Sequence, residues 1–500
     1  MNLFSKYQNY YKEILINLNT NKIFYKYYTE KKTYLDAHQL LIQVCHFIKT
    51  NSRSDKRLNI YVSCDKSFFM YVSILAILIT NNIWIPLSKS LPKKRVQDIL
   101  SGVRPDMFLC DSFDDHSAFK KYTKNIFSFD KIKKMNFFSK KLFLSDLIKK
   151  ISLNEIAFIY FTSGSTGEAK GIKISHMNII SDIFEQKKHL YNFRNIKNSK
   201  DLVFGDYYDT AFSIFFDIFF PAIYMGAAIS PAKTKSEIIL PISHLKKNKI
   251  SILVAVPSTM QRIKTYYGNK KIKHPLKVLI MTGEPFYLNI LEYIFKTFNT
   301  QKIYNCYGGT EMSNWVYFHD CKKTDLKKYK NFNLVPIGKK FSKVKSTIIK
   351  NELIVSGPMI SLGYVKKRLN KKNFILRKYS STFFTGDLVE KKYGNIICKG
   401  RKDAQIKIRG YRIEVPYVEA KLRAIKYVDQ CIVVQKKIKN YENHLVAVLK
   451  LNKKMSESKI INLASKELPH YMIPSKFIIK NKIPINSNGK IDRRKIADAI

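Results

Sequence analysis

The sequence predicts an α/β fold, with a large amino-terminal domain of layered α/β subdomains followed by a small α+β domain. Short β-rich runs alternate with helical patterns along most of the chain, as expected for α/β layers with mostly parallel strands. After about residue 400 the pattern changes, and hairpin signals replace this alternation. The 500 residues are 45% hydrophobic, which is enough for sizeable cores and too apolar for a disordered chain.

The alternation begins in the first hundred residues. Here the pattern predicts strands at 58–63 and 83–86 and helices at 69–78 and 94–101. It returns in the middle of the chain, where we expect strands at 250–256, 278–282 and 302–306 and a helix at 288–298. Two such series favour two α/β layers within one large domain.

The sequence pattern after about residue 400 predicts a compact α+β unit. Two alternating runs flank Arg409 and Gly410, as in a β-hairpin. A helix at 414–425, strands at 431–435 and 444–451 and a helix at 456–468 are expected to follow. We therefore divide the chain into domains at 1–401 and 402–500, joined near residues 401–403.

The net charge of +51 comes from 89 Lys+Arg against 38 Asp+Glu. Such a charge is typical of proteins that bind nucleic acid or anionic membranes. However, the lysines are spread along the whole chain, and Lys, Ile, Asn, Tyr and Phe are all abundant. We therefore attribute the charge to coding bias, and expect only a general attraction to acidic partners, with no specific nucleic acid.

The seven cysteines are scattered and form no C-x-x-C pair, so neither a disulfide framework nor a zinc site is expected. The amino terminus lacks the features of a signal peptide. The longest apolar stretch, residues 68–79, is too short to span a bilayer. These features predict a cytoplasmic protein without membrane insertion.

The stretch YFTSGSTGEAKGIKISH at 160–176 carries the strongest chemical signal. Its glycines allow close approach of a ligand, its hydroxyls and N–H groups can surround phosphate oxygens, and Lys170 adds a positive charge. The alternative is a polar surface turn. The spacing around Lys170 does not fit the Walker A motif, which argues against P-loop enzymes.

Further polar stretches follow expected strands. TGE at 282–284 ends one strand, and ligands bind at strand ends in open α/β sheets. In YNCYGGTEMS at 304–313 a tyrosine could stack on a base and Glu311 could hold Mg²⁺, or the stretch is a simple Gly-Gly turn. Asp387 and Arg401, in 383–403, could contact a ribose, or belong to an ordinary hairpin.

Taken in order, these stretches resemble the AMP-forming adenylating superfamily, which comprises acyl-CoA ligases, luciferases and the adenylation domains of nonribosomal peptide synthetases. The resemblance rests on FTSGSTGEAKG, TGEPF, NCYGGTE, FFTGDL, GRKDAQIKIRGYRIE and NSNGKIDR. The last two motifs are similar to the amino-acid-activating branch, including D-alanine–D-alanyl carrier protein ligases. The resemblance implies an active site in the cleft between the large domain and a small mobile carboxy-terminal domain.

The resemblance also implies residue roles. Thr310 would contact the α-phosphate, and Lys490 would bridge the acid and the α-phosphate. Glu311 would position Mg²⁺, Asp403 would be the hinge, and Gly410 would lie beside a thiol tunnel. Residues implied in ATP binding are Thr162, Ser163, Gly164, Ser165, Thr166, Gly167, Lys170, Gly283, Glu284, Asn305, Tyr307, Gly308, Asp387 and Arg401.

The substrate pocket departs from the family pattern. Relatives that activate amino acids place an aspartate in an F-D-x-S segment, where it pairs with the substrate ammonium. The corresponding position here is Phe212 or Ser213, within DYYDTAFSIFFDIFFPAIYMGAA. Asp209 or Asp217 is expected to replace it, with Asp209 preferred, and Thr282 is expected to line the same pocket. In a second departure, Gly309 replaces the proline of the family's Y-G-P-T-E motif.

The implied function is ATP-dependent activation of an amino acid as its acyl-AMP, followed by transfer to the phosphopantetheine thiol of a separate carrier protein. The cofactors would be ATP and Mg²⁺. An acyl- or aryl-acid CoA ligase is the main alternative. A basic nucleic-acid-binding protein is a third hypothesis, although no nucleic-acid-binding motif supports it.

Overall fold

A computed structural model describes residues 3–52, 56–111, 119–134, 143–162, 169–192, 196, 201–402, 405–437, 443–481, 483 and 496. The chain divides into two compact units. The first comprises Met1–Lys89, Val103–Tyr160 and Gly171–Gly400, and the second Ser90–Gly102, Phe161–Lys170 and Arg401–Ile500. The second unit thus begins its carboxy-terminal part at Arg401 and also takes in two short segments from the first half of the chain. The division at 402 remains a prediction for the extent of the domains.

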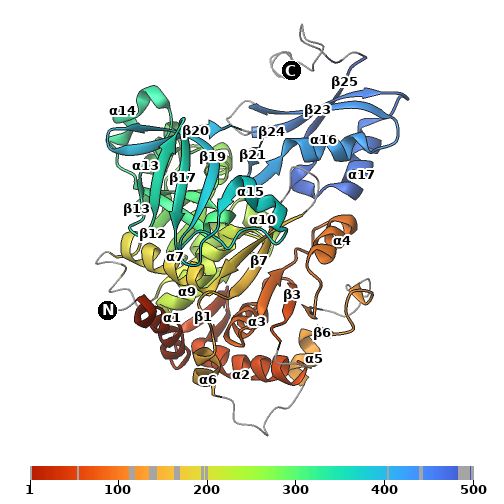
Figure 1. The fold of residues 1–500 in the computed structure, drawn as a ribbon. Helices are drawn as coiled ribbons and strands as arrows, with labels where there is room; N and C mark the ends of the chain where they lie inside the picture. Colours follow the sequence, from red (N-terminus) through yellow and green to blue (C-terminus); the bar gives the residue numbers. More distant parts are fainter. Residues whose placement is uncertain are drawn as a thin grey trace. The chain divides into compact units, whose positions relative to one another are not determined.

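The largest sheet in the described part of the chain has nine strands. Its strands β1, β12 and β13 are labelled in Figure 1. Neighbouring strands from β1 through β10, β9, β11 and β12 to β13 are parallel, and β2, β14 and β15 are antiparallel to their neighbours. In spatial order the strands are β15 (Lys339–Lys340), β14 (Asn314–Asp320), β13 (Phe298–Gly309), β12 (Ile272–Thr282), β11 (Ile252–Ala255), β9 (Val203–Asp206), β10 (Ala228–Pro231), β1 (Ile23–Tyr27) and β2 (Glu30–Thr33).

A second sheet of six described strands uses the other predicted alternation. Its order is β6 (Ile126–Ser128), β5 (Met107–Cys110), β3 (Asn59–Ser63), β4 (Ile83–Pro86), β7 (Ile156–Thr162) and β8 (Lys170–Ser175). A five-stranded sheet holds β16 (Lys345–Ile349), β17 (Glu352–Gly357), β18 (Phe374–Ile375), β19 (Ser381–Lys392) and β20 (Asn395–Arg401). The parallel strands expected at 58–63, 83–86, 250–256 and 278–282 are therefore confirmed.

Helices cover these sheets and supply much of the core. In the first unit they are α1 (Leu3–Leu18), α2 (Tyr34–Thr50), α3 (Phe68–Ile79), α5 (Phe129–Lys134), α6 (Leu144–Lys149), α7 (His176–His189), α9 (Phe216–Met225), α10 (Lys235–Ile239), α11 (Ile242–Asn248), α12 (Pro257–Tyr267), α13 (Leu288–Thr297), α14 (Asp325–Lys328) and α15 (Asn370–Asn373). None of the helices within the described ranges is both long and apolar enough to cross a membrane.

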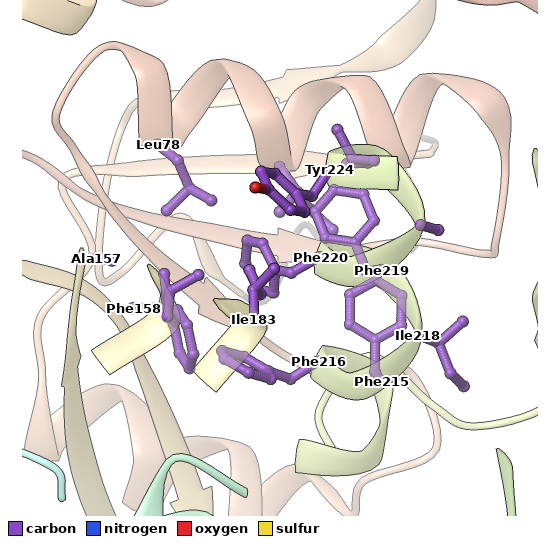
Figure 2. Close-up of a cluster of buried hydrophobic side chains, with 14 of the residues drawn as sticks. Leu78, Ala157, Phe158, Ile183, Phe215, Phe216, Ile218, Phe219, Phe220 and Tyr224 are labelled. Carbon is purple, nitrogen blue, oxygen red and sulfur yellow. The ribbon is translucent and has the colours of Figure 1, made fainter. Parts of the chain in front are cut away.

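Helix α9 is buried by its aromatic residues. Phe215, Phe216, Phe219 and Phe220 lie at its start and along its length, and Phe216 and Phe220 pack against Phe158 of β7 (Figure 2). Each of these rings is at most 2% exposed. Apolar burial on this scale is the main favourable term in folding and excludes water from the helix.

Helix α7 packs against α9 and begins at a capping box. The Ser175 hydroxyl accepts the Asn178 N–H, and the Asn178 side chain accepts the Ser175 N–H. This satisfies two backbone donors at the start of the helix. The cap therefore stabilises the first turn of α7.

The carboxy-terminal part of the second unit is α+β, as predicted. Strands β21 (Gln405–Ile408) and β22 (Tyr411–Glu414) form an antiparallel hairpin, and Arg409 and Gly410 both have positive φ in its turn. The rest of this part consists of α16 (Val415–Arg423), β23 (Val428–Lys437), β24 (Asn443–Leu451), α17 (Glu457–Glu467) and β25 (Lys476–Ile479). Helix α4 (Lys93–Gly102) belongs to the same unit.

Candidate active site

The candidate site lies where parallel strands of the nine-stranded sheet end. Thr282 is the last residue of β12 and pairs with Cys306 of β13, which continues to Gly309. Strand β9 ends at Asp206 and leads into the segment before α9. The carboxyl ends of neighbouring parallel strands share one edge of the sheet, so side chains predicted from distant motifs gather there.

Tyr307 and Asp387 form a direct contact at this edge. The Tyr307 hydroxyl donates to Asp387 Oδ2 at 2.5 Å, and both side chains are nearly buried. Burial, and then the charge of Asp387, raise the pKa of Tyr307, which therefore stays protonated and donates. The Asp387 N–H donates to the Thr385 hydroxyl at 3.0 Å and fixes the backbone there. Sequence motifs 80 residues apart are thus joined by one hydrogen bond.

Glu311 is held in a short 3-10 helix that follows Gly309. Its side chain is 2% exposed, and Oε1 accepts the Tyr364 hydroxyl at 2.9 Å. Its carbonyl accepts the Ser361 N–H at 3.0 Å. The segment before β18 therefore orients the carboxylate predicted to hold Mg²⁺ through Tyr364, and holds the backbone of Glu311 through Ser361.

Thr310 connects this edge to the segment that precedes α9. Its hydroxyl donates to Ser213 Oγ at 3.2 Å. Nearby, Asn314 Nδ2 donates to the Ser213 carbonyl at 2.9 Å. The position at which the family pattern has an aspartate is Phe212 or Ser213, and the Ser213 hydroxyl lies here beside the threonine predicted to meet the α-phosphate.

Gly308 lies where the backbone of β13 passes very close to β14. A Cβ on Gly308 would lie 1.4 Å from the Asn314 carbonyl oxygen, so only glycine fits. A Cβ on Gly309 would meet Met312 Cε at 3.5 Å, an ordinary contact. The register between β13 and β14 shifts between Tyr307 and Gly308, which marks an irregularity at the site.

The remaining predicted residues of β12 and β13 are anchored locally. The Thr282 hydroxyl accepts the Trp315 indole N–H at 2.9 Å. Glu284 accepts the Ser258 N–H at 2.9 Å, which ties the TGE turn to α12, and Gly283 adopts a φ of 82° in that turn. The Asn305 amide donates to the Pro336 carbonyl at 2.9 Å.

Asp209 takes part in a local turn. One oxygen accepts the Ala211 N–H at 2.9 Å, and the other accepts the Ser88 hydroxyl at 2.5 Å. Each of its oxygens thus has a donor from within the protein. Its assignment to the substrate pocket remains a prediction.

In the second unit, Thr162 and Lys170 bracket the predicted phosphate loop. Arg95 donates to the Thr162 carbonyl at 2.9 Å, and Lys170 Nζ lies 3.7 Å from Glu414 Oε1. Both side chains of that ion pair are largely buried, at 12% and 4% exposure. Arg401 ends β20, and Gly410 lies in the hairpin turn with a φ of 80°.

Several predicted residues lie outside the described part of the chain. They are Ser163, Gly164, Ser165, Thr166, Gly167, Asp403 and Lys490. Their assignments therefore rest on the sequence.

Three residues at the site were missed by sequence reasoning: Trp315, Tyr364 and Asn314. Trp315 is one of two tryptophans in the chain and follows GGTEMSN directly, so its rarity was the available signal. Tyr364 approaches Glu311 from 53 residues away, and no local pattern indicates such a contact.

Two family models match the chain. The model described as AMP-binding enzyme matches residues 16–365, and the model described as AMP-binding enzyme C-terminal domain matches residues 417–490. Together they cover most of the sequence and divide it near the change of texture at about residue 400.

Curated relatives are similar over most of this chain. D-alanine–D-alanyl carrier protein ligase of Staphylococcus aureus (strain MRSA252) is 27% identical over 443 residues, which are 86% of this chain and 87% of that protein. Bacitracin synthase 1 of Bacillus licheniformis is 26% identical over 491 residues, or 95% of this chain. The chain spans only 9% of bacitracin synthase 1 and 17% of bacitracin synthase 2.

Solved structures share the fold. A double mutant of o-succinylbenzoate CoA synthetase from Bacillus subtilis matches with a TM-score of 0.81 and 16% identity, over 98% of each chain. An adenylation domain of Vibrio cholerae, solved with glycyl-adenosine-5′-phosphate, also matches with a TM-score of 0.81, with 18% identity over 98% of this chain and 97% of the other. The α/β fold with a large amino-terminal and a small carboxy-terminal domain is therefore confirmed.

Proposed function

Because the chain belongs to the AMP-binding enzyme family, we propose that it activates an amino acid as its acyl-AMP. We further propose that it then transfers the acyl group to the phosphopantetheine thiol of a separate carrier protein. The observation that carries the proposal is that Tyr307, Thr310, Glu311 and Asp387 are positioned together by β13 and the Tyr307–Asp387 hydrogen bond. The 27% identity to a D-alanine–D-alanyl carrier protein ligase supports the amino-acid branch.

In this account the adenosine of ATP binds at the end of β13. The ring of Tyr307 lies against the base, while Asp387 accepts from the ribose hydroxyls. The Tyr307 hydroxyl orients Asp387, since it donates to one carboxylate oxygen at 2.5 Å. Arg401 is assigned to the ribose, and residues 162–167 with Lys170 to the β- and γ-phosphates.

Glu311 suits a Mg²⁺ ion that is shared with the nucleotide. Among the described residues, no three His, Cys, Asp or Glu side chains cluster closely enough to hold a metal by themselves. Nucleotide-bound Mg²⁺ needs only one or two carboxylates together with the phosphates. When bound, the ion would offset negative charge on the phosphates. Glu311 is nearly buried and fixed by Tyr364, so its carboxylate is preorganised for that contact.

The first step is attack of the substrate carboxylate on the α-phosphate, which forms a P–O bond and releases pyrophosphate. Thr310 is assigned to the α-phosphate, and Lys490 to the carboxylate and the α-phosphate together. Negative charge gathers at this centre in the transition state, so a cation there should increase the rate more than the affinity for ATP.

The second step is attack of a thiolate on the acyl carbon, which forms a thioester and releases AMP. The expected rearrangement is a swing of the carboxy-terminal domain about Asp403, which removes Lys490 and brings the Gly410 turn to the thiol. The positive φ of Arg409 and Gly410 makes this turn compact, so it can approach a narrow channel.

Two assays test this proposal. ATP–pyrophosphate exchange with a panel of amino acids and carboxylic acids, including D- and L-alanine, should show exchange that depends on one acid. With that acid, a phosphopantetheinylated carrier protein should gain the mass of the acyl group. Loading of free CoA but not of any carrier would support the CoA ligase alternative, and exchange with no acid would contradict the proposed function.

A further inference from the structure

A buried acidic cluster lies between α7 and α9, beside the candidate site. It consists of Asp182 and Gln186 of α7 and Asp217 of α9, which are at most 1% exposed. Gln186 Nε2 donates to Asp182 Oδ2 at 2.7 Å and to Asp217 Oδ1 at 3.1 Å. Two carboxylates thus share the donors of a single amide group.

The acidic cluster has more acceptors than donors. Asp182 Oδ1 and Gln186 Oε1 are buried and have no hydrogen-bond partner, although buried polar atoms are almost always paired. Ile183, Phe216 and Ile218, which adjoin Asp182 and Asp217 in the chain, belong to the buried hydrophobic cluster (Figure 2), so the aspartates lie next to apolar side chains. Burial raises the pKa of both aspartates, and the charge of Asp182 raises that of Asp217 further.

A short chain of contacts connects the acidic cluster to the reacting end of the site. Thr310 donates to Ser213 Oγ, and Asn314 donates to the Ser213 carbonyl. The Asn314 side chain also lies close enough to Asp217 to lower the pKa of that carboxyl. Asn314 therefore links Asp217 to Ser213, and the Ser213 hydroxyl in turn contacts Thr310.

We propose that Asp217, with Asp182 and Gln186, binds an amine of the substrate that lies beyond its α-carbon. This inference rests on the proposed function, because it takes the substrate carboxylate to lie at Thr310. The position at which relatives have the aspartate that meets the α-ammonium is Phe212 or Ser213 here, and neither side chain can neutralise that charge. Asp217 follows four residues after Ser213, in the first turn of α9.

An ammonium group would supply the hydrogen-bond donors and the positive charge that the acidic cluster lacks. It brings three donors for the oxygens of Asp182, Gln186 and Asp217, and a positive charge for the two carboxylates. In a dry site a charge is stable only when it is paired and hydrogen-bonded, so the aspartates and the ammonium stabilise each other. The substrate class is therefore a carboxylic acid with a remote amine, such as an ω-amino or a diamino acid.

The test compares four groups of acids by ATP–pyrophosphate exchange. Glycine and alanine carry only an α-amine. β-Alanine and 4-aminobutyrate carry only a remote amine, ornithine and lysine carry both, and propionate and butyrate carry none. We expect the wild-type chain to prefer acids with a remote amine to those of the same length without one by about tenfold or more.

Substitution then assigns the preference to residues. Asp217→Asn should abolish it, so that acids with and without a remote amine exchange at similar rates, since the amine would lose a buried charged partner. Asp182→Asn should act in the same direction. Glu185→Gln is the matched control, because Glu185 is a buried carboxylate on the same helix whose oxygens accept from Ser342. It should leave the preference unchanged.

The outcomes separate this inference from the proposed function. Exchange only with glycine and alanine, or only with acids that lack an amine, would overturn the inference and leave adenylation intact. A preference lost in Asp209→Asn but kept in Asp217→Asn would overturn it in favour of Asp209. Absence of exchange with every acid would overturn both. The wild-type preference needs no variant, so the test stands even if a substitution prevents folding.

Discussion

At the scale of single residues, two adjacent glycines have very different surroundings. A Cβ on Gly308 would overlap the Asn314 carbonyl oxygen, whereas a Cβ on Gly309 would make an ordinary contact with Met312. The family pattern indicated that position 309 tolerates change, because it differs there. The family pattern could not show why position 308 requires glycine, since the clash at Gly308 comes from Asn314 in the following strand.

We predict that Gly308→Ala destabilises the chain by more than about 3 kcal/mol, because backbone atoms cannot move aside cheaply. Gly309→Ala should change the free energy of unfolding by less than about 1 kcal/mol. Urea denaturation measures both, and equal effects of the two substitutions would contradict the predicted clash.

The Tyr307 hydroxyl offers a second test at this scale. Tyr307→Phe removes the donor to Asp387 and should raise KM for ATP by about tenfold or more, because hydrogen bonds to charged groups are strong. Tyr317 is its cross-strand partner and donates instead to Ser346, so Tyr317→Phe is the control. An unchanged KM in Tyr307→Phe would count against a role for Asp387 at the ribose.

At the scale of elements, helix α7 is joined to α1 by a buried pair. The Tyr11 hydroxyl and His176 Nδ1 lie 2.5 Å apart. Burial, and then the charge of Arg57, lower the pKa of His176 from 6.5 to about 3. The unfolded chain therefore binds a proton at this residue before the folded chain does, and the stability that it contributes is lost as the pH falls below 6.5.

We predict that the wild-type chain loses about 2 kcal/mol more stability than His176→Gln between about pH 7.5 and about pH 5. Glutamine does not titrate and can still accept from Tyr11. Urea unfolding of both proteins at the two pH values gives the difference. The same pH dependence in both would show that His176 does not titrate as a buried neutral group.

Elements were predictable where the pattern was local. Helix α3, at Phe68–Ile79, and strand β4, at Ile83–Pro86, lie close to where apolar periodicity and turn residues indicated. The pairing of β1 with β10 was not predictable, because their partner residues Tyr25 and Ile229 are far apart in the chain. The contact between Asp182 and Asp217 through Gln186 was also not predictable, because the sequence around Asp182 shows only a polar position in a helix.

At the scale of the whole molecule, six ordered motifs were enough to predict the fold and the family. The candidate site was less predictable, since it depends on contacts between segments such as those of Thr310 with Ser213 and Trp315 with Thr282. Because ligands bind at the carboxyl ends of strands in open α/β sheets, the sequence indicated the edge of the sheet that holds the site. It did not indicate which side chains would contact the substrate acid.

The two-step account makes a prediction for Lys490. Lys490→Ala should lower ATP–pyrophosphate exchange by about a hundredfold or more, because a cation is lost where negative charge builds up. Transfer from a chemically supplied acyl-AMP to the carrier thiol should stay within about threefold of wild type. Rapid-quench assays of each half-reaction give the comparison. Equal loss in both would refute a role confined to the first step.

The central claim is that the substrate carboxylate attacks the α-phosphate of ATP. The most direct measurement uses an acid labelled with ¹⁸O in its carboxylate and follows the label by mass spectrometry after one complete turnover. We predict that one ¹⁸O atom appears in AMP, because the bridging oxygen of the acyl-AMP comes from the acid and leaves with the phosphate. Unlabelled AMP, or ADP as the nucleotide product, would contradict this account.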